Sequence, residues 1–250
     1  MKKLVQLFIF ASLLFCVQSL NAQEAPEGED YLNVDRYFPI IGDNNAFGLG
    51  GNTYVNTSIF TIDGPELFAH FLNWGITDQF SLAVGTAAQD FLNPELFYIT
   101  PEVALPLSDN VTLNFELISI FSEDFDDIVL NPGVMLSIGT PAKNISFGYA
   151  LAIDSDGDVE TMAPLDGFYS VAGIRLNGRI PVSDQIGIFS KNDFSSQDEF
   201  TFIVSRTGAE FQLPKINIYG GLNIARSSFF GNSSTETNFV IGASFKLNNN

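Results

Sequence analysis

The sequence predicts an all-β fold, an antiparallel up-and-down transmembrane β-barrel of about 12 strands. Three observations support this prediction. Apolar and polar residues alternate with a period of two, and short turns alternate with longer polar connections. After residue 22, no stretch reaches the roughly 18 consecutive apolar residues that a membrane-spanning helix needs.

The alternation is clearest in two segments. Residues 111–117 (VTLNFEL) alternate apolar and polar side chains at every position. Residues 145–153 (ISFGYALAI) carry bulky apolar residues on one face and Ser, Gly and Ala on the other. A membrane barrel turns its bulky face to lipid and its small or polar face to the lumen. A secreted or periplasmic β-sandwich is the alternative, but it would bury the apolar face instead.

The connections fall into two classes that alternate along the chain. Short turns are expected at 77–78, 108–110, 141–144, 181–185 and 214–215. Longer polar or acidic links are expected near 58–66, 88–95, 121–127, 154–167, 193–199 and 227–237. Outer-membrane barrels have short periplasmic turns and longer external loops, so both termini are expected in the periplasm.

These connections define the expected strands. They are 46–57, 67–76, 79–87, 96–107, 111–120, 128–139, 145–153, 168–180, 186–192, 200–213, 216–226 and 238–247. Pro101 and Pro132 lie inside two of them. Because proline has no N–H for the ladder, bulges or earlier strand ends are expected at both positions.

The first residues predict export. Lys2 and Lys3 precede an apolar run that ends at a small residue, Ala22, which is typical of a cleaved signal peptide. A lipoprotein anchored through Cys16 is the alternative, but Phe15 stands where lipoprotein processing prefers a small residue. The expected organisation is a signal peptide at 1–22, a periplasmic segment or plug at 23–43 and the barrel at 44–250.

Composition excludes several function classes. The net charge of −18 becomes −20 when the two lysines of the leader are removed, which makes nucleic acid an unlikely ligand. Cys16 is the only cysteine, so a mature chain has no thiol catalysis, disulfide or cysteine metal site. The 25 phenylalanines argue against a disordered acidic chain. No cofactor is expected.

Part of the chain resembles a known group of proteins. Residues 73–85 (NWGITDQFSLAVG) and 99–114 (ITPEVALPLSDNVTLN) resemble two successive hairpins of uncharacterised Gram-negative outer-membrane β-barrel proteins of the Bacteroidetes type. Asn52, Thr53 and Tyr54 resemble their first strand. The matching motifs are structural turns, so the resemblance implies an outer-membrane barrel and carries no activity with it. The stretch 58–66 departs from the pattern and is expected to be an added external loop.

Two acidic loops are candidate cation sites. Asp154, Asp156, Asp158 and Glu160 alternate with other residues at a spacing that could hold Ca²⁺. The EF-hand pattern is incomplete, because its sixth and twelfth positions hold Val159 and Leu165. A solvated acidic loop is the favoured interpretation, also for the acidic residues at 123–127. Together, the two loops are expected to bind divalent cations loosely beside anionic lipopolysaccharide.

His70 is the single histidine and would be the base of any Ser–His mechanism, as in an outer-membrane lipid hydrolase. Alternation places it on the lipid-facing side with Leu72 and Trp74, and no nearby segment carries a nucleophile signature. An enzyme is therefore not expected.

The same alternation predicts charged side chains that face the lumen. They are Glu102, Glu116, Arg175, Arg179, Lys191, Arg206, Glu210 and Lys246. Acidic residues fall on early strands and basic residues mainly on later ones, so opposite walls are expected to carry opposite charge. Either the charges set the selectivity of a pore or they pair and plug it, because about twelve strands permit both.

Two functions follow from this pattern. The first is a narrow passive channel for small polar or charged solutes. The second is a non-conducting structural or surface-interaction barrel. Outer-membrane lipid, lipopolysaccharide and the barrel assembly machinery are the expected partners.

Overall fold

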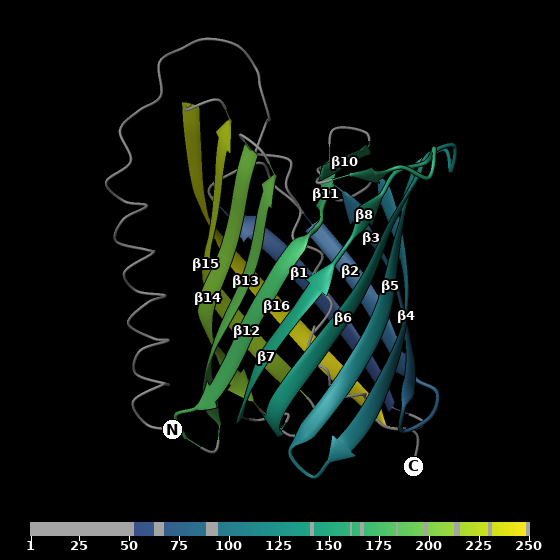
Figure 1. Ribbon diagram of the computed structural model, residues 1–250. Coiled ribbons are helices and arrows are strands. Elements are labelled where there is room, and N and C mark those ends of the chain that lie inside the picture. The colour runs from purple at the N-terminus through teal and green to yellow at the C-terminus, as the bar shows by residue number, and fades with distance from the viewer. Residues whose placement is uncertain are drawn as a thin grey trace.

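A computed structural model shows the protein as a closed antiparallel β-barrel (Figure 1). It describes residues 53–62, 68–88, 95–140, 143–160, 162–165, 168–183, 185–197, 200–212, 216–229 and 232–248. The expected signal peptide at 1–22 and the segment at 23–43 lie outside these residues. Within the described part, no helix is long and apolar enough to cross a membrane.

Twelve strands form the barrel wall, as the sequence predicts. They are β1 (Thr53–Ile62), β2 (Phe68–Gly75), β3 (Phe80–Ala88), β4 (Leu96–Ser108), β5 (Val111–Ser122), β6 (Ile128–Thr140), β7 (Lys143–Ala150), β12 (Gly173–Pro181), β13 (Ile186–Gln197), β14 (Phe200–Gln212), β15 (Ile216–Phe229) and β16 (Asn232–Asn248). Each strand pairs with the next, and β1 pairs with β16 to close the ring.

Four short strands lie between β7 and β12. They are β8 (Ala152–Ile153), β9 (Val159–Glu160), β10 (Met162–Leu165) and β11 (Phe168–Val171). β10 and β11 form a separate hairpin at the top of Figure 1. The strand expected at 168–180 is therefore two strands, β11 and β12, interrupted at Ala172.

The outer face of the wall is apolar, and the inner face is small or polar. Phe115, Phe147 and Ile188 are examples of large apolar side chains that lie about half exposed on the outside. Their strand neighbours, such as Asn114 and Ser146, are buried on the inside. This arrangement matches a lipid solvent outside and a polar lumen inside, and it is opposite to that of a β-sandwich.

Neither internal proline produces the expected bulge or strand end. The ladder between β4 and β5 omits Thr100 and Pro101 and then resumes in the same register. The ladder from β6 to β7 stops at Gly133 and resumes in the same register at Leu130, so it skips Pro132. The single register shift between these pairs lies between Pro106 and Ser108. One missing N–H per proline interrupts the hydrogen bonding locally, while the flanking pairs hold the alignment.

Several expected external loops are strand instead. β1 continues to Ile62 through much of the expected loop at 58–66, and β13 continues to Gln197. β15 and β16 have 14 and 17 residues, whereas roughly 9–11 residues cross a membrane. The upper ends of β13, β14 and β15 stand high at the left of Figure 1. The alternation fades in these ends because both faces meet water beyond the lipid, so sequence alone does not mark them as strand.

Large inward side chains fit into the wall beside glycines. Tyr219 on β15 lies across Gly242 on β16, where a Cβ would collide with the tyrosine ring. Gly220 faces outward, and the nearest atom to an added Cβ there is Phe239 Cζ at 3.4 Å. The two glycines lie on neighbouring strands. A methyl group added at Gly242 would collide with a side chain, whereas one added at Gly220 would make an ordinary contact.

Gly242→Ala is expected to lower the free energy of unfolding by ~1–3 kcal/mol, because the tyrosine must leave its position in the wall. Urea unfolding of the protein in lipid vesicles, followed by fluorescence, measures the change. Gly220→Ala is the control and is expected to change stability little. An equal effect of both substitutions would contradict this explanation.

Candidate functional site

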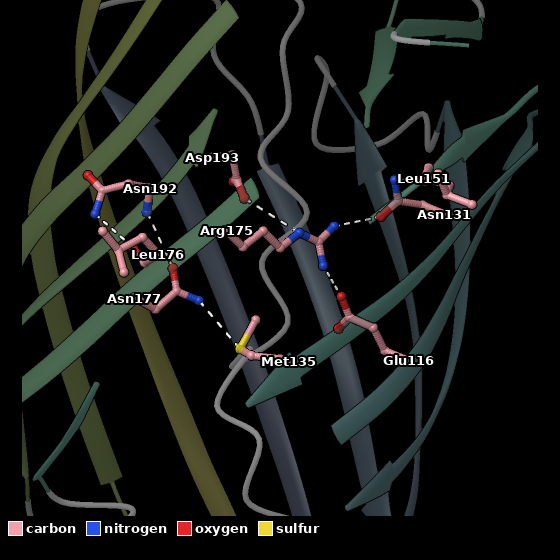
Figure 2. A network of polar contacts seen from close by, with 9 residues as sticks. All are labelled: Glu116, Asn131, Met135, Leu151, Arg175, Leu176, Asn177, Asn192 and Asp193. Carbon is pink, nitrogen blue, oxygen red and sulfur yellow. Dashed lines mark hydrogen bonds and ion pairs between the residues drawn. The ribbon is translucent and has the colours of Figure 1, made fainter. Parts of the chain in front are cut away.

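An arginine crosses part of the lumen at mid-barrel (Figure 2). Arg175 extends from β12 to Glu116 on β5, with which it forms an ion pair, and its Nη2 donates to Asn131 Oδ1 on β6 at 2.5 Å. On the other side, Arg175 Nε lies 3.5 Å from Asp193 Oδ1 on β13. We call these four residues the Arg175 bridge. The bridge connects β5 and β6, on one side of β7, with β12 and β13 on its other side.

The central pair of the Arg175 bridge is buried, and the barrel wall leaves little spare space around it. Arg175 and Glu116 are each 8% exposed. An added Cβ at Gly133 would lie 2.8 Å from Glu116 Oε1 and 3.4 Å from Arg175 Nη1. Gly133 therefore leaves the space that the bridge occupies. Because buried charges are costly unless paired, the two side chains depend on each other.

A second ion pair lies nearer the short turn that joins β12 to β13. Arg179 on β12 binds both carboxylate oxygens of Glu210 on β14, with Arg179 Nη2 at 2.5 Å from Oε2. Asn217 Nδ2 donates to the same Oε2 at 3.1 Å. Gly187 provides the space, since its Cβ would lie 2.5 Å from Glu210 Oε1. This two-point geometry fixes the direction of both side chains.

A cavity of about 70 Å³ lies beside this second pair. Its lining contains three basic side chains and one acidic side chain, namely Arg179, Lys191, Arg206 and Glu210. Lys191 and Arg206 are direct cross-strand partners on β13 and β14. The cavity therefore has an excess of positive charge, although the whole chain is acidic.

The acidic side of the lumen lies across the barrel. Glu102 on β4 and Glu116 on β5 are also direct cross-strand partners, and Ser81 Oγ donates to Glu102 Oε2 at 3.4 Å. β4 and β14 are six strands apart in either direction around the ring. A pair of carboxylates thus stands nearly opposite the pair of Lys191 and Arg206. The acidic and basic sides of the lumen are not fully separated, because the Arg175 bridge brings an arginine to Glu116 on the acidic side.

The structure places seven of the eight expected charged residues at buried or half-buried positions of the wall. Lys246 is the exception: it pairs with Val55 in the backbone ladder, but its side chain lies outside what the structure describes. Whether these residues set selectivity remains a prediction.

Sequence reasoning missed Asp193 and Asn131, which complete the Arg175 bridge. Asp193 was missed because β13 was expected to end at residue 192, whereas it ends at Gln197. Continuing the alternation from Lys191 by two residues would have found it. Asn131 lies inside an expected strand, but it is uncharged, and alternation alone does not distinguish it from other inward polar residues. Because the interior of such a barrel contains many uncharged polar side chains, the sequence does not show which asparagine contacts the arginine.

In the acidic turn at 154–160, the first carboxylate stabilises the backbone of the turn. Asp154 Oδ1 accepts hydrogen bonds from the backbone N–H of Asp156 at 3.1 Å and of Asp158 at 2.9 Å. Gly157 adopts φ +86° in this turn. Among the described residues, no group of three or more His, Cys, Asp or Glu side chains could hold a metal ion.

His70 has a serine partner that the sequence did not indicate. Ser58 Oγ lies 3.0 Å from His70 Nδ1, on the same outward face as the exposed Leu72 and Trp74. A Ser–His mechanism also needs a group that orients the base and donors for an oxyanion. Among the hydrogen bonds of the described residues, His70 has Ser58 alone, so the pair satisfies a polar ring at the apolar face.

Comparison with known proteins supports the fold. No family model matches the chain, and no curated protein matches it. Among solved structures, the NanC porin matches with a TM-score of 0.56 at 15% identity, over 78% of this chain and 100% of the porin. The KdgM porin matches with a TM-score of 0.54 at 7% identity, over 77% and 98%. At such identities the likeness establishes a porin-type barrel fold and leaves the activity open.

Glu116→Gln is expected to destabilise the folded barrel by ~3 kcal/mol, because it removes the charge that compensates buried Arg175. Urea unfolding in lipid vesicles measures the loss. The double variant Glu116→Gln/Arg175→Met should recover part of it, because the buried arginine is removed together with its partner; the recovery is incomplete because Asp193 loses its ion pair. An unchanged unfolding midpoint for Glu116→Gln would show that the bridge is not a stabilising pair.

Proposed function

We propose that the protein is a narrow passive channel of the bacterial outer membrane for small polar or charged solutes. The closed wall with an apolar outer face fits a lipid environment, and its charged inner face fits the passage of polar molecules. The porin-type fold agrees with this function. The leader at 1–22 would direct export, with the termini in the periplasm.

The cavity beside Lys191 and Arg206 is the observation that carries the proposal. A barrel that served only as a structural element could fill its interior with packed side chains, as eight-stranded barrels do. Here a cavity with an excess of basic side chains remains within the lumen. Charged rings and walls of this kind select solutes by sign in pores. The Arg175 bridge narrows the passage at mid-barrel, so only small solutes would pass.

The Arg175 bridge also favours a second candidate, a non-conducting barrel. Glu116, Asn131 and Arg175 lie buried, and they join β12 to β5 and β6 across the interior. In that case the exposed acidic loops, such as Glu123 and Asp124, would meet partners or lipopolysaccharide at the cell surface. The two candidates differ in whether ions cross the protein.

Purified protein in planar bilayers should give discrete conductance steps. Arg206→Ala should shift the reversal potential in a salt gradient toward cation selectivity, because it removes positive charge from the cavity lining. Arg226→Ala is the matched control, since Arg226 shares the outward face of β15 with the exposed Leu222. A bilayer that stays silent with correctly folded protein would refute the channel.

The double variant Glu116→Ala/Arg175→Ala should raise the unit conductance, because it removes the side chains that cross the lumen at mid-barrel. The measurement is the same bilayer recording, with folding checked by the electrophoretic mobility shift of unheated samples. Wild-type protein that is silent and a double variant that conducts would identify the native barrel as plugged. Unchanged conductance would place the narrowest point elsewhere.

A further inference from the structure

The two carboxylates of the Arg175 bridge differ in their access to water. Figure 2 shows them at separate nitrogens of one guanidinium. Glu116 pairs with Arg175 Nη1, and its side chain is 5% exposed. Asp193, the direct cross-strand partner of Arg175, lies 3.5 Å from Nε, and its side chain is 33% exposed. Water therefore reaches the bridge on the β13 side and is excluded on the β5 side.

The inner faces of the two strands differ in the same way. On β5, the six inward residues from Thr112 to Ser122 are each at most 8% exposed. On β13, the inward residues Phe189, Lys191 and Asp193 are each partly exposed. Phe189 and Lys191 also line the cavity. The open part of the lumen at mid-barrel therefore lies along β13 and leads to the cavity.

The bridge also has an excess of negative charge. Its charged members are two carboxylates and one guanidinium, which leaves one negative charge in excess. Glu116 is enclosed together with Arg175, whereas Asp193 presents its carboxylate to water. A charge beside a narrow passage with low-dielectric walls acts strongly on passing ions. Asp193 is therefore the carboxylate of the bridge that a passing solute meets.

From this arrangement we infer that Asp193 sets the charge selectivity of the passage at mid-barrel and favours solutes with a positive group over simple anions. The inference rests on the proposed channel function and deepens it. Lys191 faces the same passage two residues along β13, roughly 7 Å away. A zwitterionic solute can place its ammonium group near Asp193 and its carboxylate near Lys191, whereas Asp193 repels a simple anion.

Asp193→Asn tests the charge, because it keeps the size of the side chain. In planar bilayers with a salt gradient, the ratio of cation to anion permeability should fall by about threefold or more. Asp109→Asn, in the exposed turn between β4 and β5, is the control for loss of one negative charge and should keep the wild-type ratio. An unchanged ratio for Asp193→Asn, or an equal fall in both variants, overturns the inference.

Cysteine variants test access to water independently of conductance. Each is made in a Cys16→Ser background, so that the chain carries a single thiol. Thr100→Cys is the comparison, because Thr100 faces the lumen from β4 and is 7% exposed. Asp193→Cys should react with a charged methanethiosulfonate reagent about tenfold faster or more, measured by mass spectrometry of the folded protein. Equal rates would place the water path elsewhere and overturn the assignment.

The Asp193→Cys variant also separates an effect of charge from an effect on structure. A sulfonate-bearing reagent restores a negative charge at position 193 and should return the permeability ratio toward the wild-type value. A trimethylammonium-bearing reagent adds a positive charge there and should lower the ratio further. The same response to both reagents would show a structural role and overturn the inference.

The channel and the role of Asp193 fail separately. A protein that never conducts but reacts rapidly at position 193 and slowly at position 100 retains the water path along β13 and loses the channel. A protein that conducts with the same selectivity after Asp193→Asn retains the channel and loses the role of Asp193.

Discussion

Closure of the β1–β16 ladder is the constraint on which the rest of the structure depends. In lipid, a backbone N–H or C=O without a partner costs several kcal/mol, because no water is available to bind it. The ten residues of β1 pair with β16 on one side, and most of them pair with β2 on the other. With no open edge, each strand must divide its side chains between lipid and lumen, and this division places the charged residues inside.

The charges inside the barrel then have to be compensated by one another or by a solute. Arg175 is compensated by Glu116 and Asp193, and Arg179 by Glu210. Both pairs adjoin a glycine, Gly133 or Gly187, so the wall leaves space for long side chains where it needs them. Lys191 and Arg206 differ, because each has the other as its direct cross-strand partner.

The fold and the inward charges were predictable because both follow from a period of two. Alternation placed Glu116 and Arg175 in the lumen, but it could not predict that they meet, since they lie on strands separated by β6 and β7. Long-range contact depends on the diameter and tilt of the closed ring, which local sequence does not encode. The ends of the strands were predicted less accurately than their centres. Asp193 was missed and β1 was expected to end near residue 57, because alternation weakens where a strand leaves the lipid.

The lining of the cavity has an excess of positive charge, whereas the whole chain has a net negative charge. The exposed loops carry carboxylates such as Asp124 and Asp156, whose field in water is screened over roughly 8–10 Å. The lumen is enclosed by a low-dielectric wall, where charges act over longer distances. In the proposed channel, a solute that enters from the side of these loops would therefore meet acidic residues first and the basic cavity later. A molecule with both signs of charge, or a small anion at physiological salt, satisfies this order better than a large polyanion, which the loops would repel.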